Sequence, residues 1–337
     1  MTLYCGIDLH ANNSVVAVLD EEDRMVYEKR LPNELATITE ALGLYQAELS
    51  ACVVESTYNW YWLVDGLMAA GFPVQLAHTS ALPQYEGLKY SNDFSDARQL
   101  AHLLRLGLLP TGYIYPKEER ALRDLLRRRL LLVRQRTMHH LSLQSLIARH
   151  SGRRLNAYQI KTLRKQQLKD YLEGLDLLGG EVTHQAYLWL DQAIRQIEQE
   201  LKHHIKLRED YQLLQSIPGT GPVLGTTIAL ETGTIARFAS AGNYASYARC
   251  VKSEKISNGK YKGKGNKKNG NKYLAWAFME AGHYGSIWSP RIKRYYQRKK
   301  AKKHILVAKK AVANKLARAC YHMLKRGEKF DVTRAFG

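Results

Sequence analysis

The stretch LYCGIDLH, residues 3–10, opens a series of three strand-like segments at the start of the chain. SVVAVLD (14–20) follows after a short turn, and MVYEKRL (25–31) follows after the acidic turn EEDR (21–24). Short runs rich in β-branched and aromatic residues, separated by turn residues, are typical of β-strands. We therefore predict a three-stranded meander at the start of the chain.

Helical and strand-like segments alternate after this meander. The pattern predicts a helix over 35–48, the strand ACVVE (51–55), a helix over 61–70, the strand FPVQLAH (72–78) and a helix that begins near Asp93. A meander followed by alternating β and α elements is the order of a ribonuclease-H-like α/β fold, which we predict here. In that topology the fourth strand runs beside the first.

Four carboxylates fall where this fold would bring them together. Asp8 lies inside an apolar strand, where an unpaired charge is costly to bury, and Glu55 ends the neighbouring strand. Asp93 and Asp96 are three residues apart and share one face of a helix. A hard divalent cation relieves the repulsion among such carboxylates, so we predict a site for Mg²⁺, or alternatively Mn²⁺, that grips a phosphodiester. Taken singly, Asp93 is most simply explained as a helix N-cap and Asp96 as a first-turn acid that complements the helix dipole.

The charge of the 337-residue chain is strongly uneven. The formal net charge is +20, of which residues 1–110 contribute −8, residues 111–215 contribute +7 and residues 216–337 contribute +21. A segment this basic repels itself unless it meets a polyanion, so we expect nucleic acid as the partner. An anionic membrane surface is the alternative, but the lysines alternate with Gly and Asn and do not line one amphipathic face.

Cysteine spacing and hydropathy exclude several classes of protein. The four cysteines stand far apart without a CxxC pair, which argues against a disulfide framework and a structural zinc site. No signal-peptide pattern and no apolar run of about 18 residues is present, so we expect a cytoplasmic protein that spans no membrane.

The middle of the chain is predicted to be helical. We expect a long helix over 117–150, a short helix over 159–173 and a second long helix over 181–213. Within the second long helix, apolar residues alternate three and four apart, as in a coiled-coil seam: Tyr187, Leu190, Ile194, Ile197 and Leu201. A helical hairpin that packs on itself and an oligomerisation arm both fit this seam, and we favour the arm.

Near residue 216 the sequence SIPGTGPVLGTTIALETG (216–233) predicts a helix-hairpin-helix-like element. Gly219, Thr220 and Gly221 would form a tight turn, and Pro222 would start a helix whose N-terminal amides can hold a phosphate. An ordinary turn between helices is the alternative. Beyond it we expect a short helix within 237–250 and a last basic helix over 301–325, with these buried residues: Ile305, Val312, Leu316, Cys320 and Leu324.

A Lys/Gly-rich stretch, residues 252–274, carries eight lysines and one glutamate. Lysines neutralise phosphates and glycines allow close backbone approach, so we predict nucleic-acid contacts by Lys260, Lys262, Lys264, Lys267, Lys268 and Lys272. A serine among so many cations can act as a nucleophile towards a phosphodiester, because the positive field stabilises the developing charge. Ser253 and Ser257 lie in this stretch, although a serine before Asn-Gly, as Ser257 is, is most often part of a turn.

Five motifs, in this order, resemble the transposases of the insertion-sequence-110 family, relatives of the Piv DNA invertase that include the bridge-RNA-guided recombinases. They are GIDLHANNS (6–14), VVESTYNWYW (53–62), EGLKYSNDFSDARQLAHLLR (86–105), SIPGTGPVLG (216–225) and GKGNKKNGNKYL (263–274). The resemblance runs over nearly the whole chain. It implies a RuvC-like DEDD domain (1–115), a helical coiled-coil region (116–213) and a C-terminal helical transposase domain with a catalytic serine (214–337).

The resemblance also implies cut-and-rejoin DNA recombination, in the cytoplasm of a bacterium and at its nucleoid. The family's four acidic positions match Asp8, Glu55, Asp93 and Asp96, which would hold Mg²⁺. Its serine, which links covalently to DNA, matches Ser257 best, with Ser253 as the alternative. The family works as a tetramer of paired dimers, and a structured non-coding RNA pairs with target and donor DNA, much as in RNA-guided nucleases.

Two local departures from the family pattern are visible. Many members have Glu-Ala-Thr-Gly at the second motif, whereas Glu55 is followed here by Ser-Thr-Tyr-Asn. The segment between Tyr247 and Ser257 lacks the Gly-Leu-x-Pro of many relatives, which is why Ser253 stays open as the nucleophile.

Two other functions compete with the recombinase. The first is a metal-dependent, Holliday-junction-resolvase-like nuclease in which water is the nucleophile. The second is a non-enzymatic RNA-binding or chromosome-packaging protein, which would explain the charge but gives no reason for Asp8 inside a strand.

Overall fold

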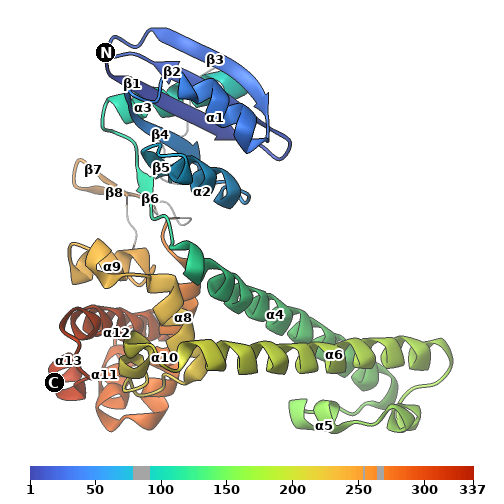
Figure 1. The fold of residues 1–337 in the computed structure, drawn as a ribbon. Helices are drawn as coiled ribbons and strands as arrows, with labels where there is room; N and C mark the ends of the chain where they lie inside the picture. Colours follow the sequence, from blue (N-terminus) through green and yellow to red (C-terminus); the bar gives the residue numbers. More distant parts are fainter. Residues whose placement is uncertain (79–91, 253–254, 264–268) are drawn as a thin grey trace. The chain divides into compact units, whose positions relative to one another are not determined.

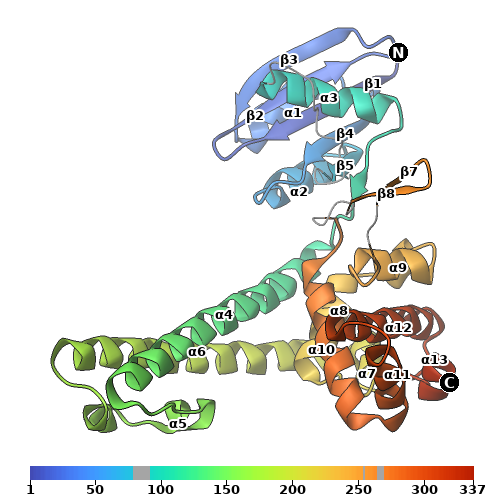
Figure 2. The same cartoon turned by 180° about the vertical axis from the view of Figure 1, so that it is seen from behind.

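The computed structural model describes residues 1–78, 92–252, 255–263 and 269–337 (Figures 1 and 2). It divides into two compact units, Met1–Lys117 and Glu118–Gly337. The division into regions 1–115, 116–213 and 214–337 stays a prediction.

The N-terminal unit is built on a six-stranded mixed sheet with the order β3-β2-β1-β4-β5-β6. Its first three strands form the expected antiparallel meander: β1 (Leu3–Leu9), β2 (Asn13–Leu19) and β3 (Met25–Pro32). The sheet continues with β4 (Leu49–Glu55) parallel to β1, β5 (Val74–Ala77) parallel to β4, and β6 (Thr111–Gly112) antiparallel to β5. The fourth strand therefore lies beside the first, in agreement with a ribonuclease-H-like fold.

Helices cover both faces of this sheet (Figures 1 and 2). Helices α1 (Leu35–Gly43) and α2 (Tyr61–Ala69) pack on one face, and α3 (Asp93–Arg105) packs on the other. The side chains of β1 alternate between these faces, as in any strand. Its residues Cys5, Ile7 and Leu9 join the core with α1 and α2, while Gly6 faces α3. Asp8 therefore points to the α3 side.

Helix α1 is shorter than the predicted helix over 35–48. It ends at Gly43, and the chain returns to β4 through successive turns, with hydrogen bonds from Tyr45 N to Leu42 O and from Glu48 N to Tyr45 O. Glycine is a weak helix former because it loses the most backbone entropy, which favours the stop at this position.

Two long helices leave the core of the second unit. They are α4 (Lys117–Ser151) and α6 (Gly174–Ile205), joined by ion pairs from Arg129 to Glu198 and from Arg136 to Asp191. The single helix predicted over 159–173 is wrong: the segment forms α5 (Ala157–Thr162) and a 3-10 helix, η2 (Lys165–Asp170). Leu163 between them has an extended backbone, which separates the two.

The second predicted long helix, 181–213, also differs from the structure. It starts earlier, at Gly174, and stops at Ile205, and a separate helix α7 (Glu209–Leu214) follows. Its predicted seam is buried within the single chain, at Tyr187, Leu190, Ile194 and Leu201. Of the two predicted roles, the helical hairpin that packs on itself therefore describes this seam.

The C-terminal helices share a core with the ends of the two long helices, through residues such as Leu126 and Leu201. They are α8 (Pro222–Thr232), the 3-10 helix η3 (Ile235–Arg237), α9 (Ala241–Tyr247), α10 (Lys272–Trp288), α11 (Pro290–Lys300), α12 (Ile305–Arg326) and α13 (Val332–Phe336). The last long helix begins at Ile305, not at residue 301. Ile305, which we expected to be buried, is exposed because it occupies the first turn.

A small hairpin interrupts the helices of the second unit. Strands β7 (Lys255–Ser257) and β8 (Lys260–Gly263) are joined by Asn258 and Gly259, both at positive φ (49° and 68°). Asn-Gly is the preferred sequence for this two-residue turn.

All four cysteines are free and buried. Within the described ranges, none of the helices combines the length and apolar character needed to cross a membrane.

Candidate metal centre and nucleic-acid interface

The acidic centre depends on a close approach between α3 and β1. A Cβ atom added at Gly6 would lie 2.1 Å from the carbonyl oxygen of Ala97 and 2.6 Å from the amide nitrogen of Ala101. Only glycine therefore allows this helix to rest on this strand. Since Gly6 and Asp8 share one face of β1, the first turn of α3 is brought to the side of the sheet that carries Asp8.

The start of α3 is fixed by a capping box. The side chain of Asn92 accepts a hydrogen bond from Ser95 N (2.9 Å), and Ser95 Oγ accepts one from Asn92 N (2.9 Å). The N-cap is therefore Asn92, and the simpler explanation of Asp93 as the cap is wrong. The carboxylates of Asp93 and Asp96 belong to the first turn of the helix.

Asp8 and Glu55 lie on adjacent parallel strands. Ile7 pairs with Val54, so Asp8 and Glu55 occupy the next position on each strand. Asp8 is only 3% exposed. Burial, a hydrogen bond with Asp8 and the negative charges of Asp8 and Asp96 raise the pKa of Glu55 to about 8. Near neutral pH this pair therefore retains a proton that a cation can replace.

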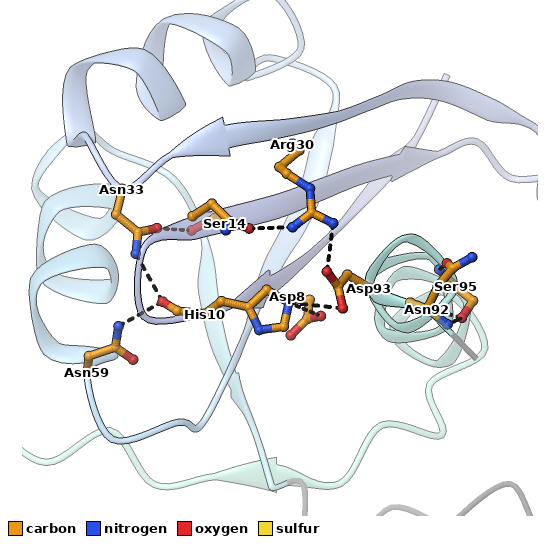
Figure 3. Close-up of polar contacts among 10 residues, drawn as sticks. Asp8, His10, Ser14, Arg30, Asn33, Asn59, Asn92, Asp93 and Ser95 are labelled. Atoms are coloured by element: carbon orange, nitrogen blue, oxygen red, sulfur yellow. Dashed lines mark hydrogen bonds and ion pairs between the residues drawn. The ribbon is translucent and has the colours of Figure 1, made fainter. Parts of the chain in front are cut away.

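The two helical carboxylates have opposite electrostatic environments. Arg30 Nη2 donates to Asp93 Oδ2 (2.6 Å) and holds the pKa of Asp93 below its usual value (Figure 3). For Asp96, burial and the charges of Asp8 and Asp93 raise the pKa. All four predicted acids thus belong to one electrostatic cluster.

His10 is a residue of this centre that the sequence analysis did not select. Its Nε2 lies 3.1 Å from Asp8 Oδ2 and 3.4 Å from Asp93 Oδ1 (Figure 3). Asp8, His10 and Asp93 each offer a ligand atom, and these atoms lie within 4.8 Å of one another. The available signal was its spacing, because a residue two positions after Asp8 points to the same side of an extended chain. Carboxylate oxygens and an imidazole nitrogen are a donor set that fits a divalent metal ion.

In the second unit, the tight turn of the predicted helix-hairpin-helix-like element lies between α7 and α8. Gly219 has φ +87°, and a Cβ there would lie 2.3 Å from the amide nitrogen of Gly285, so this glycine is needed for packing on α10. Gly221 has φ −81° and nothing within 4 Å of its position for a Cβ. Thr220 is 6% exposed, and its Oγ1 has no hydrogen-bond partner within the described ranges. The turn lines a cavity of about 540 Å³ together with Tyr284 and Trp288.

The predicted nucleophile is on the β7–β8 hairpin. Ser257 is exposed and pairs with Lys260 across the Asn-Gly turn, and Lys262 is exposed on β8. Lys272 is exposed at the first position of α10. Four further predicted residues lie outside the described ranges: Ser253, Lys264, Lys267 and Lys268.

The β7–β8 hairpin belongs to the segment between α9 and α10, and both ends of this segment are attached to the helical core. Arg249 Nε donates to the carbonyl oxygens of Asn269 (2.9 Å) and Gly270 (3.0 Å), which ties the start of the segment to its end. Asn271, the N-cap of α10, donates from Nδ2 to the fully buried Glu231 (2.7 Å). Arg127 also donates to Glu231, and these contacts hold the pKa of its carboxyl below the usual value despite burial.

A mixed α/β domain with clustered carboxylates, followed by a basic helical domain, defines a metal-dependent enzyme that acts on nucleic acid. Comparison with known proteins agrees with this class and narrows it. The family model "Transposase IS116/IS110/IS902 family" matches residues 211–297. A second family model, for the DEDD-type transposases of IS110 elements and described as "Transposase", matches residues 5–151. The chain belongs to the IS110 family of transposases. It is a DNA transposase, and membership of a DEDD family implies dependence on a divalent metal ion.

Two relatives show similarity over most of the chain. The "Transposase for insertion sequence element IS1328" of Yersinia enterocolitica is 25% identical over 340 residues, which cover 97% of this chain and 98% of that protein. The "Putative transposase y4qE" of Sinorhizobium fredii is 26% identical over 280 residues, which cover 82% of this chain and 68% of that protein.

Proposed function

We propose that this transposase cuts and rejoins DNA through a phosphoserine intermediate, with Mg²⁺ bound by Asp8, Glu55, Asp93 and Asp96. The observation that carries the metal site is the grouping of the carboxylates: the buried Asp8 lies beside Glu55 on the adjacent strand and within reach of the first turn of α3, and the pKa of Glu55 is raised accordingly. Carboxylates that repel each other so strongly need a proton or a cation at neutral pH. When bound, a divalent ion neutralises charge on a phosphodiester and polarises its P–O bonds.

The nucleophile in this proposal is Ser257 Oγ. Its attack forms an Oγ–P bond while one P–O bond to deoxyribose breaks, and the serine proton ends on the released deoxyribose oxygen. Rejoining reverses these bond changes with a hydroxyl of another strand. The exposed lysines around the hairpin, Lys260 and Lys262, supply positive charge near the reacting phosphate.

The 216–222 turn is proposed as a second contact with the nucleic-acid backbone. Gly221 is the N-cap of α8 and has open space around the position of a Cβ, so the backbone of this turn is accessible to a phosphate group from outside the chain. The N-terminus of α8 provides amide groups that bind a phosphate oxygen, and the hydroxyl of Thr220, which has no hydrogen-bond partner among the described residues, lies in the same turn. Among the described lysines, Lys260, Lys262 and Lys272 would add sequence-independent contacts.

We further propose that a structured, bridge-type RNA supplies sequence recognition for target and donor DNA. This part rests on the family resemblance and on the charge of +21 in residues 216–337, which suits backbone contacts with more than one nucleic-acid strand. Base pairing would then read the sequence and the protein would read the shape of the duplex.

A homodimer that assembles into a homotetramer is the proposed active form. Helix α6 carries a second apolar stripe that is separate from the buried seam, with more than half of each side chain exposed: Leu175, Leu178, Val182 and Trp189. The first three are spaced by three and four residues, and Trp189 follows seven residues later, as expected for a coiled-coil contact between two chains.

The experiment that tests the proposal compares wild type with Asp8→Asn and Ser257→Ala. Protein purified from cells that carry the whole element is incubated with labelled target and donor DNA and Mg²⁺, and then separated on a denaturing gel. We expect a covalent protein–DNA adduct in wild type and none in either variant. Strand cleavage without an adduct, unchanged in Ser257→Ala, would overturn the phosphoserine step and favour a hydrolytic nuclease.

A further inference from the structure

His10 lies in the acidic centre, within ion-pair distance of two of its carboxylates, but is not one of the four predicted ligands. Its ring nitrogen Nε2 is shielded from solvent and lies between Asp8 and Asp93, yet it makes no hydrogen bond of acceptable geometry with any described residue. A histidine that served only as a hydrogen-bond donor would point its N–H at one of these carboxylates.

We propose that Nε2 of His10 is a ligand of the divalent metal ion held by Asp8 and Asp93, and that this nitrogen makes the centre prefer Mn²⁺ to Mg²⁺. The inference rests on the metal centre of the proposed function and adds a ligand and a metal preference to it.

The first support is the spacing of the three donor atoms. Adjacent ligands of an octahedral ion, each at about 2.1 Å from the metal, are about 3 Å apart. The distances from His10 Nε2 to Asp8 Oδ2 (3.1 Å) and Asp93 Oδ1 (3.4 Å) are close to this value. All three donors therefore fit around one ion with little movement.

The second support is the way in which the surroundings orient these groups. Arg30 binds Oδ2 of Asp93, which leaves Oδ1 facing His10 (Figure 3). The carbonyl oxygen of His10 accepts hydrogen bonds from Asn33 Nδ2 and Asn59 Nδ2, both at 3.0 Å. The main chain of His10 is thus anchored from two directions, while its ring stays available to a ligand.

The preference for Mn²⁺ follows from the chemistry of the donor. Mg²⁺ is a hard ion that is bound almost entirely through oxygen, whereas transition metals accept imidazole nitrogen readily. Replacing one oxygen donor by nitrogen therefore favours Mn²⁺. The competing explanation is that His10 is a protonated cation paired with the two carboxylates, in which case a metal ion would displace it.

Pulsed electron paramagnetic resonance of the full-length protein loaded with Mn²⁺ separates these explanations. We expect ¹⁴N modulation from a directly bound imidazole in wild type and its loss in His10→Gln. The affinity for Mn²⁺ should fall about ten-fold in this variant, and the affinity for Mg²⁺ should fall by less. His102→Gln is the matched control, since His102 pairs with Asp23 outside the centre, and it should keep the signal.

Two outcomes would overturn the inference: ¹⁴N modulation absent from wild type, or modulation retained in His10→Gln. If wild type binds Mn²⁺ without ¹⁴N modulation and Asp8→Asn abolishes binding, the carboxylate centre stands and only the role of His10 is rejected. If wild type binds neither Mn²⁺ nor Mg²⁺, the metal centre of the proposed function fails as well.

Discussion

Gly6 of β1 lies directly beneath Ala97 of α3, so closely that a methyl group on Gly6 would lie 2.1 Å from the Ala97 carbonyl oxygen. Asp96 immediately precedes Ala97, and Asp8 follows Gly6 by two residues on the same face of the strand. This one contact therefore sets how near the carboxylates of α3 come to the carboxylate of β1.

Gly6→Ala should damage both stability and metal binding. Overpacking of this kind costs roughly 1–3 kcal/mol, and any shift of α3 moves Asp93 and Asp96 away from Asp8. Urea unfolding and Mn²⁺ titration measure the two effects. Gly43→Ala is the matched control, because nothing lies within 4 Å of that position: it should leave metal affinity unchanged and should not lower stability, since alanine is the better helix former. Equal metal affinity in wild type and Gly6→Ala would contradict the role of this contact.

Metal-free protein should lose stability as the pH rises towards about 8. Because burial and Asp8 raise the pKa of Glu55, the folded state keeps a proton that the unfolded state releases above pH 4.5. The contribution is thus fully present below about pH 4.5 and lost as the pH approaches 8. Glu55→Gln should flatten this slope in urea unfolding between pH 5 and pH 8. A slope unchanged by Glu55→Gln would show that another group is responsible.

Metal binding at pH 7 should release a proton for the same reason. A divalent ion replaces the proton that Glu55 shares with Asp8, so the affinity should rise with pH up to about 8. Calorimetric titration in buffers of different ionisation enthalpy measures this release. We expect close to one proton in wild type and none in Glu55→Gln, and equal release in both would contradict the assignment.

Much of the N-terminal unit could be predicted because its signals are local. The apolar run of β1 with Asp8 inside it, the meander and the position of Glu55 at the end of β4 follow from alternation along the strands. The close approach of Gly6 to Ala97 depends on packing between distant segments, so no local pattern reveals it. The spacing of His10 places it on the side of Asp8, whereas its distance from Asp93 depends on the packing of α3 against β1.

The second unit was harder to predict. Helix α10 has no clear apolar face in its sequence because Gly282 and Gly285 lie where it meets α12 and the 216–222 turn. A Cβ at Gly285 would lie 2.9 Å from the carbonyl oxygen of Pro218. Glycines in the middle of a helix lower its predicted propensity, although here they permit the packing.

Gly221→Ser should separate binding from stability. Serine is a favourable N-cap, so the variant should be as stable as wild type or slightly more stable. Its side chain, however, would occupy the place where a phosphate approaches, and the affinity for DNA or RNA should fall roughly ten-fold, or about 1.4 kcal/mol. Fluorescence anisotropy at fixed salt measures this. Gly179→Ala on α6, also with open space around it, should bind as wild type does. Unchanged binding in Gly221→Ser would remove the turn from the interface.

Charging the exposed stripe of α6 should dissociate the proposed oligomer. In the double variant Leu178→Lys with Val182→Lys, lysines that repel each other replace an apolar contact between chains. The buried seam of α6 is not altered. Light scattering should then report a smaller species than wild type. Leu44→Lys, at an exposed position in the other unit, should not change the mass. A mass that is the same in wild type and the double variant would contradict the stripe as an interface.

The most direct test of the central claim is mass spectrometry of the trapped protein–DNA adduct after nuclease and trypsin digestion. The sequence separates the two candidate serines cleanly, because trypsin yields SEK (253–255) and ISNGK (256–260) as different peptides. We predict that the nucleotide remnant is attached to ISNGK, through Ser257, and only when a divalent metal ion is present. A remnant on SEK would move the nucleophile to Ser253. DNA that is cut while both peptides stay unmodified would contradict the phosphoserine mechanism.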